Sequence, residues 1–260
     1  MNKSFHALFV LPLLLVILFL STGCEREKNK KLTIAVSANM QYAMEELVEA
    51  FTQASGTPCE LIVGSSGKLT AQIMEGAPFD LFLSADMKYP EEIDSGGKAL
   101  GKPLIYAYGH LVLWSIDEGT ELTAEGLLSE EVTHIAIANP ETAPYGVAAV
   151  ELLQGMGIWE RVRGKLVFGE SIAQTNQFIL SGSAQAGITA RSVVSSPAAL
   201  DKGHWTEADH SLYKPIEQGV VAIKREGSDE EGSQAFISFL RSPVAHEILV
   251  RFGYGVKSSE

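Results

Sequence analysis

Short apolar runs alternate with longer stretches of helical spacing from residue 32 almost to the end of the chain. The first apolar run, over 32–36, predicts a buried strand. Within the next stretch, 40–55, apolar residues such as Ala43, Leu47 and Phe51 recur at helical spacing. Gly56 follows and indicates a C-terminal helix cap. This alternation predicts an α/β fold whose mixed, mostly parallel sheets are wrapped by helices.

The same pattern predicts the remaining elements. Further strands are expected at 60–63, 81–83, 135–138, 166–168, 186–189 and 220–223. Further helices are expected at 69–75, from about 86 to 95, and at 123–128, 146–156, 171–180, 236–240 and 244–251. The run 104–114 is extended with Gly109 inside it, as expected of a chain that passes between two lobes. Residues 195–210 are rich in Ser, Pro, Asp and Gly and are expected to form a loop.

The N-terminus resembles a bacterial lipoprotein signal. A weakly positive start precedes an apolar run over 9–20, which is short for a bilayer span. Small residues then lead to Cys24, so we expect a signal peptide over 1–23, lipid on Cys24 and a charged tether over 24–31. Ser21 stands where a large aliphatic residue is usual, which leaves a plain secretory signal or an uncleaved anchor as alternatives. The expected location is periplasmic or at the cell surface, with a lipid anchor in the membrane.

Charge and cysteine content limit the partners. The chain has a formal charge of −12, which would repel a nucleic acid but leaves a small anion possible, because such an ion feels mainly its own pocket. If Cys24 carries lipid, Cys59 has no partner for an intrachain disulfide. Cys59 lies in a predicted strand and is expected to be a buried structural thiol rather than a reactive one.

Candidate binding groups stand at turns that join a strand to a helix. The first turn, 35–40, contains Ser37 and Asn39, either of which is a suitable N-cap. The second, 64–69, holds Ser65 and Ser66 between two glycines. Backbone N–H groups gather at such turns, and the helix dipole favours an anion there. Each turn alone is equally consistent with an ordinary helix cap.

Two similar turns follow in the second half of the chain. Tyr145 stands just before the predicted helix at 146–156, in a loop held by two prolines, and its phenol can donate a hydrogen bond. The turn 169–174 leaves the N–H groups near Ile172 free. Ligands of open α/β sheets lie beyond the carboxyl ends of the strands. Two lobes that face each other would therefore bring all four turns to one cleft.

Other types of site fit the sequence less well. The 64–69 turn lacks the residues of a nucleotide P-loop at 62 and 69, and the Gly that an esterase elbow needs at 68. The six histidines form no metal pair at helical spacing. We therefore expect no bound metal cation and no cofactor. A hydrolase that uses Ser66 would need a general base, and none is apparent in the sequence.

Four segments carry a resemblance to a known family. They are Ala-Val-Ser-Ala-Asn-Met at 35–40, Gly-Ser-Ser-Gly-Lys-Leu at 64–69, Gly-Ala-Pro-Phe-Asp-Leu-Phe-Leu-Ser-Ala-Asp at 76–86, and the Asn-Pro and Ala-Pro-Tyr-Gly of 139–146. Together they resemble the periplasmic molybdate-binding proteins of ABC importers, over about residues 31–258. The block at 76–86 is the most specific of the four.

The resemblance implies a function and a set of contacts. It implies capture of molybdate or tungstate for a membrane permease, with the oxyanion held by groups at Ala38, Asn39, Ser66, Tyr145 and Ile172. Some family members have Ser where this chain has Asn39 and Tyr where it has Ala190; a subgroup matches the present pattern. A binding protein for sulfate or phosphate is the first alternative, and the Ser66 hydrolase is the second.

The resemblance also implies an architecture. It is the two-lobed fold of periplasmic binding proteins, with 32–106 and 218–258 in one lobe, 107–217 in the other, and the ligand in the cleft between them. A monomer without enzymatic activity is expected. A fully deprotonated tetrahedral oxyanion only accepts hydrogen bonds, so neutral N–H and O–H donors match it without a counter-ion. Closure of the lobes around the ion is the expected signal to the permease.

Overall fold

Two five-stranded sheets organise the chain in the computed structural model, which describes residues 31–256. The predicted signal peptide over 1–23, the lipid site at Cys24 and nearly all of the predicted tether lie outside the described residues. Residues from Leu32 onward form a compact unit by themselves. Within the described residues, no helix is both long and apolar enough to cross a membrane.

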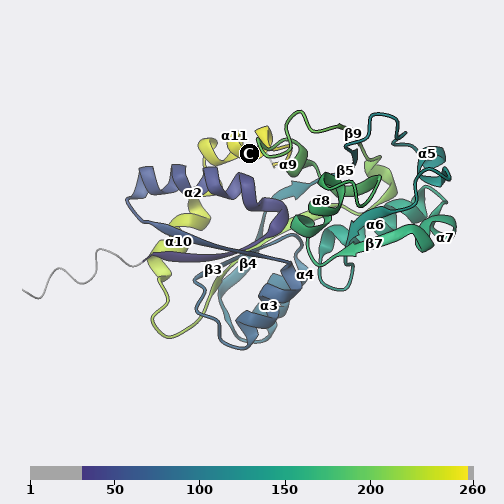
Figure 1. The fold of residues 1–260 in the computed structure, drawn as a ribbon. Coiled ribbons are helices and arrows are strands. Elements are labelled where there is room, and N and C mark those ends of the chain that lie inside the picture. The colour runs from purple at the N-terminus through teal and green to yellow at the C-terminus, as the bar shows by residue number, and fades with distance from the viewer. Residues whose placement is uncertain (1–30, 257–260) are drawn as a thin grey trace, which may run out of the picture. The chain divides into compact units, whose positions relative to one another are not determined.

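The first sheet combines the start of the chain with its end (Figure 1). Its strands, in spatial order, are β2 (Cys59–Gly64), β1 (Leu32–Ser37), β3 (Leu81–Ser84), β10 (Ile216–Ile223) and β4 (Ala99–Gly109). β1 pairs in parallel with β2 and with β3, whereas β10 is antiparallel to both β3 and β4. Only β10 therefore runs against the other strands, and the prediction of a mixed, mostly parallel sheet is confirmed.

The second sheet repeats this arrangement with the middle of the chain. Its strands, in spatial order, are β7 (Leu166–Gly169), β6 (Ile135–Ala138), β8 (Ala186–Ala190), β5 (Leu111–Ser115) and β9 (His204–Glu207). β6 is parallel to β7 and β8, and β5 is antiparallel to β8 and β9. The chain passes from the first sheet to the second between Gly109 and Leu111, inside the extended run that the sequence predicted.

Helices connect the strands of both sheets. In the parts of the chain that form the first sheet these are η1 (Ala38–Met40), α2 (Gln41–Ser55), α3 (Ser66–Met74), α4 (Lys88–Ser95), α10 (Glu230–Phe239) and α11 (Pro243–Arg251). In the part that forms the second sheet they are α5 (Ala124–Leu128), α6 (Pro144–Gly155), α7 (Trp159–Val162), η2 (Arg163–Lys165), α8 (Ile172–Leu180), α9 (Arg191–Val194) and η3 (His210–Leu212).

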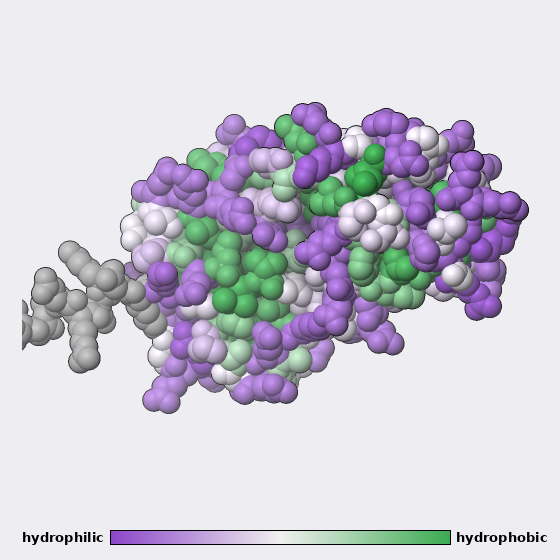
Figure 2. Space-filling view, in the orientation of Figure 1, coloured by the Kyte–Doolittle hydropathy of each residue, from purple (hydrophilic) through white to green (hydrophobic). Residues whose placement is uncertain are grey.

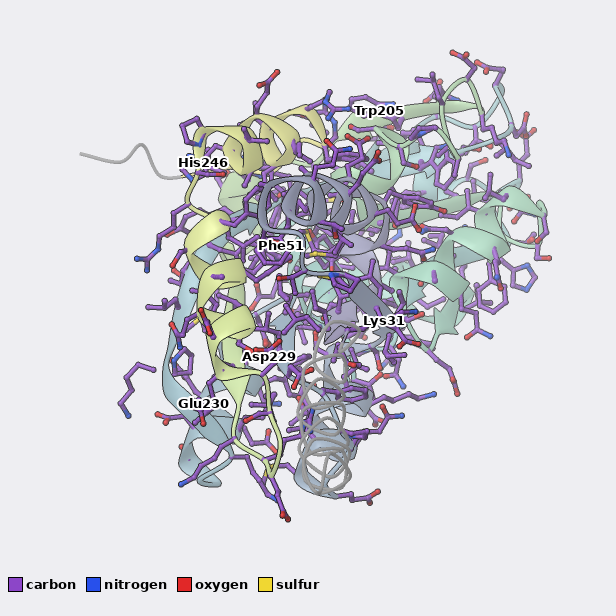
Figure 3. The ribbon with its side chains drawn as sticks, turned by 90° about the vertical axis from the view of Figure 1, so that its left-hand side faces the viewer. Lys31, Phe51, Trp205, Asp229, Glu230 and His246 are labelled. Carbon is purple, nitrogen blue, oxygen red and sulfur yellow. The ribbon has the colours of Figure 1, made fainter. Side chains whose placement is uncertain are left out.

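The first sheet is buried on both faces because its side chains alternate between two apolar clusters. Ile34 and Val36 of β1 join the cluster under α2, α10 and α11, whereas Ala35 joins the cluster under α3 and α4. In the first cluster the ring of Phe51 packs against Phe236, with centroids 4.9 Å apart. Figure 3 shows Phe51 on the side of α2 near α10. The second sheet has a separate core, which contains Trp114.

A buried carboxylate connects separate segments of the first sheet. Asp80, just before β3, is fully buried and accepts hydrogen bonds from the backbone N–H groups of Thr33 at 2.9 Å and Asp229 at 3.1 Å. It also forms an ion pair with Arg225, with an N–O distance of 2.5 Å. Three segments far apart in the sequence therefore meet at one side chain.

Most predicted elements are present, and their boundaries differ by a few residues. Gly56 has a φ of 74° and ends α2, which confirms the predicted cap. The predicted loop over 195–210 is wrong in part, because β9 pairs there with β5. Three of the four residues of β9 are exposed, and the segment lacks the apolar alternation of a strand. It is a strand because it pairs with β5. α10 begins six residues before its predicted start, and the Asp229 side chain caps it.

Polar residues cover much of the molecular surface seen in Figure 2, and apolar residues gather between α2 and α3 and over part of the second sheet. The edge strands contribute single exposed apolar side chains, Val63 on β2 and Phe168 on β7. Scattered apolar side chains of this kind are usual on protein surfaces.

Candidate functional site

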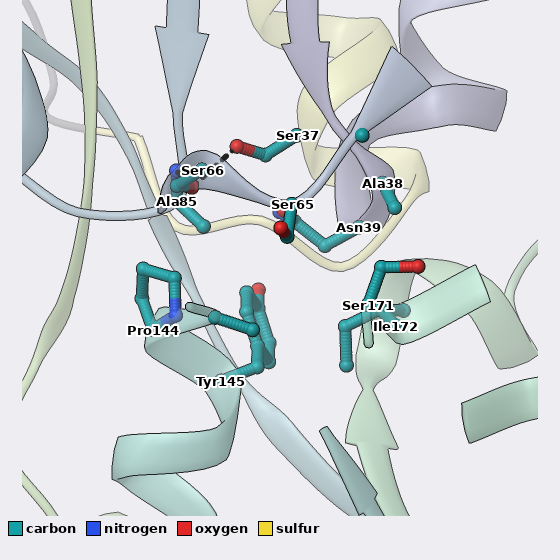
Figure 4. Close-up of a pocket in the computed structure, with 12 residues that line it drawn as sticks. Ser37, Ala38, Asn39, Ser65, Ser66, Ala85, Pro144, Tyr145, Ser171 and Ile172 are labelled. Atoms are coloured by element: carbon teal, nitrogen blue, oxygen red, sulfur yellow. Dashed lines mark hydrogen bonds between the residues drawn. The ribbon is translucent and has the colours of Figure 1, made fainter. Parts of the chain in front are cut away.

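The four strand-to-helix turns meet at one cavity (Figure 4). All five residues proposed from the sequence line it: Ala38, Asn39, Ser66, Tyr145 and Ile172. The remaining lining residues, which are not among those five, are Ser37, Gly64, Ser65, Ala85, Ala143, Pro144 and Ser171. None of the lining residues is charged. The tertiary fold therefore brings together groups from both sheets, as expected.

The helices that begin at this cavity have no side-chain caps. Ser37, Ser65 and Ser171 occupy the N-cap positions of η1, α3 and α8, yet none of their side chains makes a capping hydrogen bond. Elsewhere Thr123 and Ser242 do accept such bonds from their helices. The first N–H groups of a helix have no acceptor within it. These serines therefore leave the first N–H groups to other acceptors, such as an anion at the positive ends of the helices. The Gly67 N–H of α3 is an exception, because it already donates to the Thr142 carbonyl oxygen.

The Ser37 side chain holds Ser66 instead of capping a helix. The two Oγ atoms are 2.6 Å apart, and both residues are buried (Figure 4). The Ala85 N–H donates to Ser66 Oγ at 3.1 Å. If the Ser37 hydroxyl also donates to Ser66 Oγ, the Ser66 proton is left for a ligand. The prediction that Ser37 or Asn39 caps the following helix is wrong in part: Ser37 occupies the N-cap position of η1 without a capping bond, and Met40 occupies that of α2.

Asn39 uses its side chain inside the protein. Its Nδ2 donates to Gln218 Oε1 at 2.8 Å and to the Tyr254 hydroxyl at 3.0 Å. Its carbonyl oxygen accepts a 2.7 Å hydrogen bond from the Ser192 hydroxyl. Gln218 in turn donates to the Ala85 carbonyl oxygen at 3.2 Å. Asn39 can therefore offer a ligand its backbone N–H, while its side-chain amide is held by residues on the side of the first sheet and its carbonyl oxygen by Ser192 on the side of the second.

Tyr145 reaches the cavity from the start of α6. Only 1% of its surface is exposed, and its hydroxyl makes no hydrogen bond of good geometry with any residue between 31 and 256. Asn39 and Tyr254 nevertheless lie near enough to affect its titration. Burial raises the pKa of Tyr145 well above its ordinary value, so the phenol keeps its proton and remains a donor.

Two contacts between the two halves lie beside the cavity, at residues close to its lining in the sequence. The Gly67 N–H donates to the Thr142 carbonyl oxygen at 2.9 Å. Lys68 of α3 forms an ion pair with Glu170, which precedes α8. About 10 Å³ of the cavity is open to the centre of a water molecule, roughly the space that one water needs. An ion held here would therefore touch its lining directly, without a hydration shell.

Two features considered in the sequence analysis, a metal site and the residue at position 190, do not contribute to the cavity lining. Within the described part of the chain, no group of three or more His, Cys, Asp or Glu residues is arranged to hold a metal ion. Ala190, which replaces a tyrosine found in some relatives, ends β8 and is buried away from the lining.

Three serines that line the cavity outside the expected contact set share one signal. Ser37, Ser65 and Ser171 each stand where a strand ends and a helix begins. Serine is common at that position for capping alone. Only the geometry shows that these three do not cap.

Comparison with known proteins places the chain in a family. A family model for bacterial extracellular solute-binding proteins matches residues 32–255. The chain belongs to this family. It is 38% identical over 226 residues to the molybdate-binding protein ModA of Azotobacter vinelandii, covering 86% of this chain and 89% of that protein. It is also 38% identical over 221 residues to ModA of Rhodobacter capsulatus, covering 85% of this chain and 86% of that protein.

The fold agrees with this membership. The structure of the periplasmic molybdate-binding protein of Azotobacter vinelandii matches with a TM-score of 0.82 at 32% identity, covering 88% of this chain and all of that one. The solute-binding protein described here thus has the two-lobed periplasmic binding protein fold, with a five-stranded mixed sheet in each lobe.

Proposed function

We propose that this protein captures molybdate or tungstate outside the cytoplasm and delivers the ion to the membrane permease of an ABC importer. One observation carries the proposal: four helix starts without side-chain caps converge on a buried cavity whose lining has no charge. The names of the related molybdate-binding proteins favour this ligand over other small anions.

The donors in this proposal are backbone groups at Ala38, Asn39 and Ile172 together with the hydroxyls of Ser66 and Tyr145. A proton-free tetrahedral dianion offers acceptors on every side, and these groups offer donors. Hydrogen bonds to a charged group are stronger than neutral ones, and the exclusion of water strengthens them further. Neutral dipoles therefore suffice to hold the ion without a lysine or arginine.

The two lobes in this proposal are 32–106 with 218–258, and 107–217. Ligand entry requires them to separate, because Gly67 and Lys68 of one lobe contact Thr142 and Glu170 of the other beside the cavity. A bound ion adds hydrogen bonds to both lobes and so favours the closed arrangement. The permease would distinguish the closed form from the open one.

We also propose, from the sequence, that residues 1–23 are a signal peptide and that lipid on Cys24 anchors a monomeric protein to the membrane. Cleavage before Cys24 and labelling with a fatty acid, both lost in Cys24→Ser, are the expected results. Secretion without lipid would leave the plain secretory signal as the correct interpretation.

A binding role is favoured over hydrolysis by the surroundings of Ser66. The groups hydrogen-bonded to Ser66 Oγ are the Ser37 hydroxyl and the Ala85 N–H, neither of which can act as a general base. A serine nucleophile needs such a base within hydrogen-bond reach.

Titration calorimetry of the intact protein with molybdate, tungstate, sulfate and phosphate tests the proposal. We expect saturable heat with molybdate and tungstate, and weaker or no heat with the other two. Heat with sulfate or phosphate but none with molybdate would assign the protein to a different oxyanion. The absence of heat with all four would reject the proposed site.

A further inference from the structure

Ser65 is a buried serine whose hydroxyl has no protein partner. Only 4% of its surface is exposed, and its Oγ makes no hydrogen bond to the part of the chain that the structure describes. As the N-cap residue of α3, with φ −77° and ψ 150°, it has the backbone conformation of a capping serine. Its side chain nevertheless does not accept from the helix.

Two unpartnered groups of this kind belong to residues that line the cavity. Among the described residues, the buried side-chain polar atoms without a hydrogen-bond partner are Ser65 Oγ, Tyr145 Oη, Tyr106 Oη and His204 Nδ1. The first two belong to lining residues of the same cavity. Leaving a buried polar group unpaired costs about 1–3 kcal/mol. Two unpaired hydroxyls in one small cavity indicate that a bound ligand supplies their hydrogen-bond partner.

The two hydroxyls come from opposite lobes. Ser65 belongs to the turn before α3, and Tyr145 to the start of α6. In Figure 4 the Ser65 hydroxyl faces the side of the cavity on which Tyr145 lies, whereas the Ser66 hydroxyl pairs with Ser37. A ligand between them would receive one hydrogen bond from each lobe.

We propose that Ser65 is a further ligand-binding residue, whose hydroxyl donates a hydrogen bond to the bound oxyanion opposite the donor Tyr145. This inference rests on the proposed function and adds to it. Because Ser65 is neutral, it contributes a hydrogen bond without changing the charge of the cavity. It also supplies the lobe of the first sheet with a contact that forms only when ligand is present.

The test measures molybdate affinity and the unfolding midpoint of the ligand-free protein in Ser65→Ala. Affinity should fall about 10-fold, since a hydrogen bond to a charged group is lost. The midpoint without ligand should stay the same or rise, because an unpaired buried hydroxyl has been removed. A serine with a structural role would give the reverse result, with a lower midpoint and unchanged affinity.

Ser196→Ala is the matched control. Ser196 is fully buried in the other lobe, does not line the cavity, and donates to the Val193 carbonyl oxygen at 2.6 Å. Its loss should lower the midpoint and leave molybdate affinity unchanged. Wild-type affinity in Ser65→Ala would overturn the assignment of Ser65 alone. A wild-type protein that binds none of the oxyanions would instead overturn the proposed function.

Discussion

The hydroxyl of Tyr145 occupies the space where a side chain on residue 109 would begin. A Cβ placed on Gly109 would lie 2.1 Å from Tyr145 Oη and 3.0 Å from Gln218 Nε2. Gly109 is also the last residue of β4, at the point where the chain crosses to the second sheet. The reach of a proposed ligand donor therefore depends on a residue in the segment that joins the lobes.

Gly109→Ala should both weaken binding and destabilise the protein. The added methyl group must displace the Tyr145 ring, and overpacking of this kind costs about 1–3 kcal/mol. Molybdate affinity should fall by about 10-fold or more, because the Tyr145 donor moves away. Calorimetry and urea unfolding measure the two effects. Gly164→Ala is the control, since a Cβ there meets no atom within 4 Å. Equal affinity and stability in the two variants would contradict the close contact between residue 109 and Tyr145.

Tyr145→Phe should separate binding from stability. It removes a buried hydroxyl that has no good partner among residues 31–256, so the unfolding midpoint without ligand should not fall. Molybdate affinity should drop by about 10-fold or more. Tyr42→Phe, at a partly buried tyrosine outside the cavity lining, should change affinity little. Loss of stability without loss of affinity would show that Tyr145 only fills space.

The ion pair between Lys68 and Glu170 should slow release of the ligand. It joins the two lobes beside the cavity, but the side chains are 50% and 68% exposed, so it contributes little energy. Lys68→Met should raise the dissociation rate up to about 5-fold, an effect that high salt removes. Lys102→Met breaks an ion pair with Asp94 inside one lobe and should not alter release in stopped-flow measurements. Identical rates in all three proteins would exclude a role in closure.

Asp80→Ala should lower the stability of the protein without changing the cavity. The carboxylate is fully buried against Arg225, and loss of one member of a buried pair costs about 3–5 kcal/mol. Urea unfolding should show this loss, while the fraction that remains folded binds molybdate normally. Glu160→Ala breaks an exposed pair with Arg163 and should cost less than about 0.5 kcal/mol. Weaker binding in folded Asp80→Ala would connect this residue to the cavity.

Cys59 should react slowly with thiol reagents near neutral pH. The residue is only partly buried, not fully buried as predicted. This partial burial raises its pKa from an ordinary value of 9.0 to about 11, so little thiolate is present. Labelling should accelerate as the pH approaches 11, and Cys59→Ser measures the background. The raised pKa also means that the unfolded chain loses this proton first. The contribution of Cys59 to stability is thus fully present below pH 9.0 and is lost as the pH rises to about 11. Fast labelling at pH 7 would show an exposed, reactive thiol.

The structure changes how the first turn should be tested. Asn39→Ala would remove two hydrogen bonds from the buried network with Gln218 and Tyr254. A change in affinity in this variant could not be separated from a loss of stability. Ser65 and Tyr145 are better probes, because their hydroxyls carry no such structural bonds among the residues described.

Local sequence pattern was sufficient for the order of most strands and helices and for the turns that form the cavity. Apolar alternation over Ile34, Ala35 and Val36 specifies a strand buried on both faces, and Gly56 ends a helix by its own conformational freedom. The block at 76–86 identified the family although it is mostly structural, since Asp80 holds the sheet and only Ala85 from it lines the cavity.

Contacts between distant segments decided the rest. Ser65 and Ser66 are neighbours with the same side chain, and only the position of Ser37, 29 residues from Ser66, determines which hydroxyl is engaged. The amide of Asn39 is bound by Tyr254, 215 residues away, and β9 forms because β5 offers it a partner. Helix and strand preferences act over a few residues, whereas the direction of a buried hydroxyl depends on atoms that only packing brings near.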